Sequence, residues 1–275
     1  MVINQKDISA NVKSALAEDV GSGDVTAELI PEEALASATL ITREHAVVAG
    51  CQWFDEVFNQ LPHSTTINWN IADGDIVAPE QTLCTIEGSA RSLLTGERTA
   101  INFLQTLSAT ATTVASYVEI IKDTETKILD TRKTIPGLRL AQKYAVACGG
   151  GTNHRVGLYD AILIKENHIM AAGSITQAVK QAKAKNLPVE VEVESLAELE
   201  EALTAEADQI LLDNFDLALL EKAVNINQGR AKLEASGNII KDELYAIAKT
   251  GVDYISIGAL TKHIRAIDFS MRINL

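Results

Sequence analysis

The spacing of apolar residues predicts short helices and strands in the first hundred residues. Apolar side chains recur every three or four positions over residues 7–18 and again over 52–60, which predicts two amphipathic helices. Alternating or short apolar runs predict strands at 38–42, 46–49, 65–69 and 82–87. Together these elements predict a small N-terminal α/β sandwich domain.

A long helix follows, and its apolar stripe advances by three or four residues from Ile101 to Ile121. The pattern predicts that this helix begins at Gly96 and that Arg98 lies in its first turn. A cation gains nothing from the helix dipole at that end. Arg98 is therefore most simply a solvated surface residue, unless an anion lies nearby.

From residue 127 onward the pattern alternates regularly between strand and helix. The expected strands are 127–130, 160–165, 188–194, 208–213, 231–235 and 253–258. Ser174 and Ser195 each begin a capping-box pattern, and Gly251 follows the helix expected over 242–250 as a C-cap would. Six successive strand–helix units imply parallel strands with right-handed crossovers, in either a doubly wound sheet or an α/β barrel.

The residues at the strand ends favour the barrel. Nearly every expected strand ends in a charged or small polar residue, and in a barrel all of these ends surround one active-site mouth. In an open sheet only the two strands at the switch point would face a ligand. We therefore expect an open α/β barrel of six to seven strands over residues 106–263, preceded by the α/β sandwich domain over 1–105, which the tail 264–275 could join.

Composition excludes several classes of protein. The 275 residues are 47% hydrophobic and 22% charged, and no apolar run reaches the roughly 18 residues of a membrane span. The net charge of −13 argues against a nucleic-acid partner, which would need a basic face. The three cysteines show no metal-binding spacing and are expected to be packing residues in a cytoplasmic protein.

One basic segment stands out in this acidic chain. Residues 130–168 carry six cations against three acids, a local balance of +3. A basic pocket in an acidic molecule indicates a small and strongly anionic ligand.

Candidate chemistry gathers at the strand ends. The donors suited to carboxylates and phosphates are Arg132, Lys133, His154, Arg155 and Lys165. Glu194 and Asp213, on later strands, are suited to Mg²⁺, sugar hydroxyls or a cationic centre. Ser236, Gly237, Asn238 and Gly258 follow strands directly and would let backbone amides approach a phosphate. The combination implies a ligand with phosphate, sugar and carboxylate groups.

Each of these signals also has a structural interpretation. Lys165 could equally be a surface charge, and His168 is more simply a hydrogen-bonding cap than a catalyst. Arg139 and Lys143, one helical turn apart, are expected on a solvated face. The glycine-rich segment 18–26 is more often a loop than a phosphate site. Glu190 and Glu192 could face the barrel interior, but we expect only Glu194 at its rim.

The segments just described resemble the quinolinate phosphoribosyltransferase family. The matching blocks include GERTAINFLQTLSATAT (96–112), DTRKTIPGLRLAQKYAVACGGGTNHRVGLYDAILIKENHI (130–169), VEVEVES (189–195), ILLDNF (210–215) and LEASGNI (233–239). They follow the family's order over most of the chain, and the longest block is very specific.

The resemblance implies that quinolinate and phosphoribosyl pyrophosphate give nicotinate mononucleotide, pyrophosphate and CO₂ with Mg²⁺. It implies that Arg132, His154, Arg155 and Lys165 grip the quinolinate carboxylates, with Thr131 and Lys133 beside the substrates. Glu194 and Asp213 would serve the ribose and the Mg²⁺–pyrophosphate, directly or through water, and with Lys133 would be the catalytic residues. Ser236, Gly237, Asn238 and Gly258 would bind phosphate. Arg98 would enter a neighbouring subunit's site in a homodimer or a larger assembly of dimers.

Two rival functions stay open at this stage. One is a phosphoribosyltransferase for nicotinate that does not decarboxylate, although a single carboxylate should need fewer cations. The other is a non-catalytic relative that binds anions, although such a protein should have lost members of the set.

Overall fold

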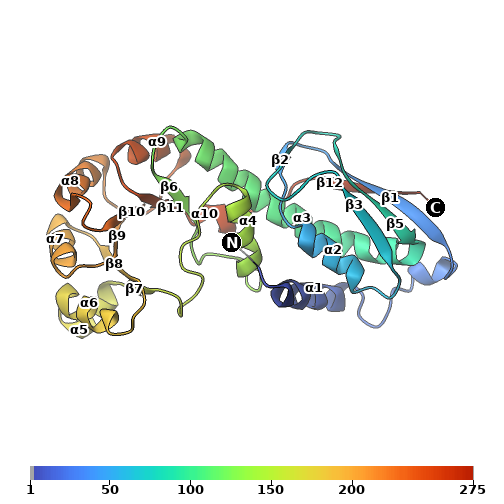
Figure 1. The fold of residues 1–275 in the computed structure, drawn as a ribbon, viewed down its shortest axis with the longest axis horizontal. Helices are drawn as coiled ribbons and strands as arrows, with labels where there is room; N and C mark the ends of the chain where they lie inside the picture. The colour runs from blue at the N-terminus through green and yellow to red at the C-terminus, as the bar shows by residue number, and fades with distance from the viewer. Residues whose placement is uncertain (1–2, 275) are drawn as a thin grey trace. The chain divides into compact units, whose positions relative to one another are not determined.

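The computed structural model describes residues 3–274, and these residues form two compact units (Figure 1). Unit 1 consists of residues 3–115, 134–150 and 260–274. Unit 2 consists of residues 116–133 and 151–259. A compact unit need not coincide with a division along the sequence, and the predicted boundary between residues 105 and 106 stays a prediction.

Unit 1 is built on a four-stranded antiparallel sheet in the order β12-β1-β5-β3. Its strands are β1 (Leu35–Thr42), β3 (Thr65–Trp69), β5 (Thr82–Ser89) and β12 (Phe269–Asn274). A second, small ladder joins β2 (Ala46–Val47) to β4 (Ile76–Val77), and a 3₁₀ turn, η1, spans Ala27–Leu29. The four strands expected from the hydrophobic pattern are confirmed, whereas β4 and β12 were not anticipated.

The core of unit 1 is aromatic. Helix α1 (Gln5–Asp19) packs beside α2 (Cys51–Asn59), and α2 buries Trp53, Phe54 and Phe58 completely or almost so. The ring of Phe54 lies 5.3 Å from that of Phe58 and 5.2 Å from that of Trp69 on β3. Tilted and edge-on ring pairs of this kind add to the stabilisation from burial alone.

The long helix α3 (Ala90–Val118) begins six residues earlier than expected. Arg98 therefore does not lie in the first turn, although it is exposed as expected. Gly96 does not start the helix but allows close packing, because a Cβ there would lie 2.7 Å from Cε1 of Phe58. The error arose because a helical glycine needed for packing resembles a helix boundary in the sequence.

Helix α4 (Arg139–Cys148) contradicts the expected solvated face. Lys143 is completely buried and Arg139 is only partly exposed. Ala141, Ala145, Leu138 and Tyr144 pack into the core of unit 1, so little of the circumference of this ten-residue helix reaches solvent. A four-residue spacing of cations shows that they share a face but not whether that face is covered.

Unit 2 is the predicted open barrel. Its sheet has the order β6-β11-β10-β9-β8-β7, and every neighbouring pair is parallel. The strands are β6 (Lys127–Leu129), β7 (Ile162–Ile164), β8 (Val189–Val193), β9 (Gln209–Asp213), β10 (Lys232–Ser236) and β11 (Tyr254–Ser256). An isolated parallel bridge joins Leu129 to Thr152 beyond β6, which agrees with the expected six to seven strands.

Helices cover the outside of this curved sheet (Figure 1). They are α5 (Glu166–Ala172), α6 (Ile175–Lys183), α7 (Leu196–Thr204), α8 (Leu217–Asn227) and α9 (Lys241–Lys249), with η2 (Glu119–Ile121) before β6. The short α10 (Ala259–Lys262) follows β11 along the chain, and its residues from Leu260 onward belong to unit 1. Ser174 and Ser195 accept hydrogen bonds from the amides of Gln177 and Glu198, as the capping boxes predicted. Gly251 follows α9 in the left-handed conformation, as predicted.

Strand β8 shows how the barrel sorts its side chains. Val189, Val191 and Val193 are buried on the face that α6 and α7 cover. Because side chains alternate along a strand, Glu190 and Glu192 point to the opposite, inner face. Strand β8 therefore contributes two carboxylates to the inner face of the barrel.

The three cysteines are free thiols that pack into or against the core of unit 1, as expected. Burial is the main cause that raises the pKa of each thiol, to about 11 for Cys148. Between residues 3 and 274, no helix combines the length and apolar character needed to cross a membrane.

The packing of α4 yields a stability prediction. Gly149 has an ordinary negative φ, yet a Cβ there would clash with the carbonyl oxygen of Ala111 and lie 2.8 Å from Cβ of Val114. Gly149→Ala should therefore lower the stability of the protein by about 1–3 kcal/mol, as overpacking does. Thermal unfolding would measure it, with Ala17→Ser on the exposed face of α1 as the control. An unchanged melting temperature would contradict the close packing.

Candidate active site

The C-terminal ends of the barrel strands bring charged residues together at one edge. We call this edge the mouth and define it by Lys133, Lys165, Glu192, Asp213 and Gly258. Lys165, directly after β7, forms an ion pair with Glu192 on the adjacent strand β8. Lys165 is half exposed, but this pairing directs it towards the mouth and makes it more than a surface charge.

The pKa of Asp213, at the end of β9, responds to the other charges of the mouth. Burial raises the pKa of its carboxyl, and the negative charge of Glu192 raises it further, while Lys165 and Lys133 act in the opposite direction. Groups that follow β6, β7, β8 and β9 therefore lie within electrostatic reach of one another. The mouth thus holds two carboxylates beside two ammonium groups, and carboxylate oxygens are donors suited to a divalent cation.

Two glycines allow the backbone near the mouth to pack closely against neighbouring residues. A Cβ on Gly258 would lie 2.8 Å from Cδ of Lys133 and 3.5 Å from Oγ1 of Thr131. A Cβ on Gly237 would clash with the side chain of Asn214 and lie 2.9 Å from its backbone nitrogen. Close approach of the backbone after β10 and β11 therefore requires glycine.

The loop after β10 is tied to the end of β9. The amide of Asn214 donates to the carbonyl of Ser236 at 2.9 Å, and Gly237 and Asn238 both have positive φ values, +107° and +42°. Successive residues of this kind expose backbone amides in a turn, which is a common way to bind an anion.

Two guanidinium groups of unit 2 lie within electrostatic reach of each other. Burial lowers the pKa of Arg155, and the positive charge of Arg132 lowers it further, while Glu190 and Asp160 oppose this shift. Asp160 also shapes the segment by accepting the amides of Val156 at 2.7 Å and Gly157 at 2.9 Å. Like charges held together in this way are suited to an anion with more than one negative group.

His154 belongs to a buried polar cluster. Its backbone amide donates to Asp130 at 2.9 Å, and its Nε2 lies 2.7 Å from Glu190 Oε2 and 3.5 Å from Glu234 Oε2. A cavity of about 330 Å³ in unit 2 is lined by His154, Arg155 and Glu190 among others, so this region adjoins open space.

The structure also places other residues that the sequence analysis singled out. Glu194 is exposed, continues the inward alternation of β8, and donates its amide to Glu198 at 2.7 Å. Arg98 lies in unit 1, and its entry into another subunit's site stays a prediction. His168 is the expected cap, because its Nδ1 accepts the amide of Lys165 at 2.9 Å. The segment 18–26 is a loop in which Asp24 accepts the amides of Thr26 and Ala27.

Sequence reasoning missed part of the inner face. The expectation that Glu194 alone lies at the rim was too narrow, because Glu192 pairs with Lys165 there. Gln209 was not singled out as an inner residue, although its amide donates to Glu234. The strict alternation of valine and glutamate in β8 was a usable signal, and counting inward positions on each strand would have found these residues.

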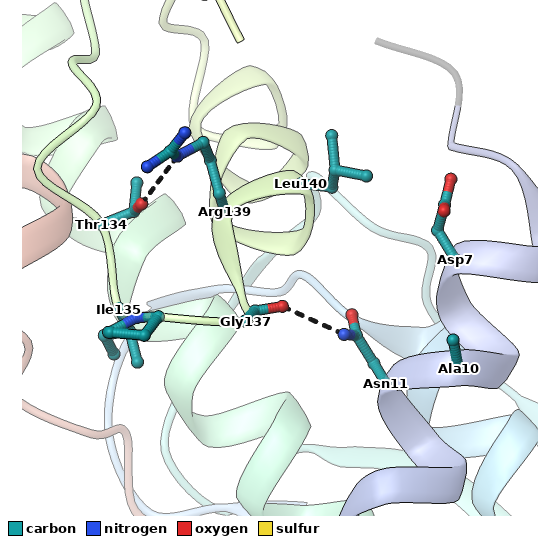
Figure 2. A pocket seen from close by; sticks show the side chains of 9 residues that line it. Asp7, Ala10, Asn11, Thr134, Ile135, Gly137, Arg139 and Leu140 are labelled. Carbon is teal, nitrogen blue, oxygen red and sulfur yellow. Dashed lines mark hydrogen bonds between the residues drawn. The ribbon is translucent and has the colours of Figure 1, made fainter. Parts of the chain in front are cut away.

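A second cavity, in unit 1, lies between α1 and the segment 134–140 (Figure 2). Asp7 and Asn11 line one side of it, and Asn11 donates to the carbonyl of Gly137 at 3.1 Å. Arg139 donates to Thr134 Oγ1 at 3.1 Å on the other side. The chain thus places Arg139 in a cavity wall instead of on a solvated face.

Comparison with known proteins agrees with this geometry. The C-terminal domain model of quinolinate phosphoribosyl transferase matches residues 110–272, and the N-terminal domain model matches residues 24–108. The chain belongs to the quinolinate phosphoribosyltransferase family. The resemblance seen in the sequence is confirmed.

Relatives within this family are similar along nearly the whole length of this chain. The nicotinate-nucleotide pyrophosphorylase (carboxylating) of Mycobacterium leprae is 40% identical over 94% of this chain and 95% of its own. The chloroplastic enzyme of the same name from Oryza sativa is 40% identical over 98% of this chain and 78% of its own. The solved nicotinate-nucleotide pyrophosphorylase from Francisella tularensis is 49% identical, with a TM-score of 0.96, over 99% of this chain and 98% of that one.

The buried carboxylates yield a prediction on pH and stability. Burial and the charge of Glu190 raise the pKa of Glu234 from 4.5 to about 8. The native state thus keeps a proton that the unfolded chain loses above about pH 4.5, so stability falls as pH rises towards 8. Glu234→Gln lacks this titration, so its melting temperature relative to the wild type should rise between pH 5 and pH 9.

Differential scanning calorimetry at both pH values would measure this change. Each kcal/mol in the free energy of unfolding changes the melting temperature by about 2–4 °C in a protein of this size. A difference in melting temperature that does not depend on pH would show that Glu234 is ionised in the native state at neutral pH.

Proposed function

We propose that this chain transfers the phosphoribosyl group of phosphoribosyl pyrophosphate to the ring nitrogen of quinolinate, releasing pyrophosphate and CO₂. The proposal rests on one observation above all. This chain belongs to the quinolinate phosphoribosyltransferase family, and the mouth of its barrel brings cations and acids together. The product would be nicotinate mononucleotide, so the reaction would serve NAD biosynthesis.

The quinolinate side of the site is cationic. Arg132 and Arg155 offer two neighbouring guanidinium groups, which can each bind a carboxylate with two parallel hydrogen bonds. His154 lies next to Arg155 in the sequence, and Lys165 stands at the mouth. Two carboxylates on adjacent ring carbons need more than one fixed cation, and this arrangement supplies several.

The pyrophosphate side combines acids with backbone amides. Glu194 and Asp213 would hold Mg²⁺, directly or through water, because carboxylate oxygens at a strand end are the donors that this ion prefers. Burial and the negative charge of Glu192 raise the pKa of Asp213, and a bound cation would act in the opposite direction, as Lys165 and Lys133 do. When bound, Mg²⁺ neutralises charge that develops on the departing pyrophosphate. Ser236, Gly237, Asn238 and Gly258 would bind phosphate through exposed backbone.

The chemistry needs positioning more than it needs a nucleophile. As the bond from ribose C1 to pyrophosphate breaks, C1 acquires positive charge and the pyridine nitrogen attacks it. Lys133, packed against Gly258, would meet the negative charge on the leaving group. The substituted nitrogen is then cationic, so loss of CO₂ from the adjacent carbon leaves a carbanion that this nitrogen stabilises and a proton quenches. The barrel residues hold both reactants in place throughout.

A complete site would draw on two subunits. Arg98 is exposed on α3, and we place it in the site of a neighbouring copy, in a homodimer or an assembly of dimers. The three free thiols suit a reducing compartment, and we assign the protein to the cytoplasm on that ground.

Product analysis tests the reaction against its rivals. Quinolinate labelled with ¹⁴C at the C2 carboxylate, with phosphoribosyl pyrophosphate and Mg²⁺, should release ¹⁴CO₂ in step with nicotinate mononucleotide. Lys165→Ala should lower kcat/KM by about a hundredfold, since a charge-assisted bond to the substrate is lost. Lys180→Ala, an exposed lysine on α6, is the matched control.

Either rival would give a different result. Turnover of nicotinate but not of quinolinate would favour the phosphoribosyltransferase that does not decarboxylate. Binding of both acids without turnover would favour the non-catalytic relative. A wild-type rate for Lys165→Ala would remove that residue from the site.

The shared site can be tested by mixing two impaired variants. Arg98→Ala and Lys165→Ala should each retain only about one per cent of wild-type activity, because each removes a cation from every site. If Arg98 acts in the partner's site, subunit exchange restores one complete site in each mixed dimer and about a quarter of wild-type activity. Size-exclusion chromatography would confirm that exchange has occurred. No recovery after confirmed exchange would mean that Arg98 serves its own subunit.

A further inference from the structure

A buried hydrogen-bonded cluster lies on the inner face of the barrel, next to the cationic residues. It consists of His154, Glu190, Gln209 and Glu234. The side chains of Glu234, Glu190 and His154 are only 1%, 8% and 13% exposed. The strands β8, β9 and β10 contribute the two acids and the amide, and the segment after Gly151 contributes the histidine. No role proposed above uses Glu190, Glu234 or Gln209.

The distances in the cluster are unequal. Nε2 of His154 lies 2.7 Å from Glu190 but 3.5 Å from Glu234. The amide nitrogen of Gln209 donates to both acids, at 2.9 Å to Glu190 and 2.6 Å to Glu234. Glu190 is therefore the direct partner of the imidazole, and Glu234 supports the pair from the other side.

Burial restricts how many charges the cluster can hold. Two adjacent buried carboxylates cannot both remain ionised next to a single imidazole without a large energetic cost. The cluster is neutral when Glu234 is protonated, His154 is an imidazolium and Glu190 is ionised. Burial opposes ionisation of Glu190, but the hydrogen bond and charge of His154, with hydrogen bonds to Glu234 and Gln209, together lower the pKa of Glu190. Burial and the charge of Glu190 raise the pKa of Glu234 to about 8.

We propose that Glu190 and Glu234 are positioning residues that hold His154 as an imidazolium of fixed orientation, with Glu190 as its counter-charge and Glu234 as a neutral acid. The imidazolium then joins Arg132 and Arg155 as a third fixed cation for a dicarboxylate. This inference rests on the proposed function, because it assigns the cation to quinolinate. It extends that function by explaining how a histidine stays charged at neutral pH.

The other groups around Glu234 are compatible with this assignment. The elements packed near the cluster bring the following charged, titratable or polar groups: Asp130 after β6, Arg155 beside His154, Gln209 and Asp208 at the start of β9, Lys232 on β10, and Tyr254 and Ser256 on β11. Ser256 donates to Glu234, and Asp130 binds the backbone amide of His154. Lys232 is paired with Asp253 at 2.6 Å.

A metal ion is the alternative occupant of such a cluster, since all three ligand atoms lie within 4.8 Å of one another. Gln209 argues against it. Its amide directs a donor nitrogen at both carboxylates, whereas a metal site would present an acceptor oxygen. Shared protons satisfy this arrangement and a cation does not.

Histidine titration followed by NMR tests the proposal directly. The full-length protein contains five histidines, and loss of one signal in His154→Gln would identify His154. In the wild type, His154 should remain protonated above pH 8. Glu190→Gln should lower its pKa by about 1–3 units, the usual effect of removing an adjacent opposite charge.

Kinetics should separate the two acids. Glu190→Gln should raise the KM for quinolinate by about tenfold or more while leaving the KM for phosphoribosyl pyrophosphate within about twofold. In the wild type the KM for quinolinate should climb above pH 8 as Glu234 ionises. That climb should disappear in Glu234→Gln, because glutamine imitates the neutral acid. Glu201→Gln on α7, whose carboxylate binds Thr176, is the control.

Three results would overturn the inference. The first is a wild-type His154 that titrates near pH 6.5. The second is an equal loss in both variants with no shift of the His154 signal, as a purely structural cluster would give. The third is a stoichiometric metal ion that Glu190→Gln releases. If the wild type releases no CO₂ from quinolinate while the titration behaves as expected, the proposed function fails and the charged cluster stands.

Discussion

The inner face of the barrel has to hold charged side chains without leaving any charge uncompensated. The hydrogen bond between His154 and Glu190, at 2.7 Å, is the contact on which this balance depends. It allows one carboxylate to stay ionised at depth, and Gln209 and a shared proton then accommodate Glu234. Removing one member of a buried, paired set costs far more than removing a solvated pair. The charges of this buried cluster are therefore already compensated without any contribution from the mouth.

At the mouth the charges are less deeply buried and less tightly paired. Lys165 and Glu192 are paired at the mouth, but the lysine is half exposed and can exchange partners with an incoming anion. Asp213 is held among charges of both signs, so its protonation responds to whatever binds nearby. The buried charges of the barrel are thus held in fixed pairs, whereas the charges at the mouth can exchange partners. This difference suits an enzyme that must release a polyanionic product after each turnover.

The two expectations that failed in unit 1 share a cause. Gly96 was taken for a helix start, although it is needed for close contact with Phe58, and Lys143 was assigned to solvent, although neighbouring elements enclose its helix. Local pattern reports the period of a helix and the type of each side chain. It does not report which neighbours a helix will have.

The sequence alone determined the type and order of the strands and helices of unit 2, because strand and helix periods differ. It also placed Lys165, Asp213 and Gly258 at one mouth, since parallel strands must end at the same edge. Only the tertiary structure decided that Glu192 pairs with Lys165 and that His154, Glu190 and Glu234 share a buried cluster. Those contacts join residues 27 to 80 positions apart, and the protonation of these residues depends on burial, which no local spacing encodes.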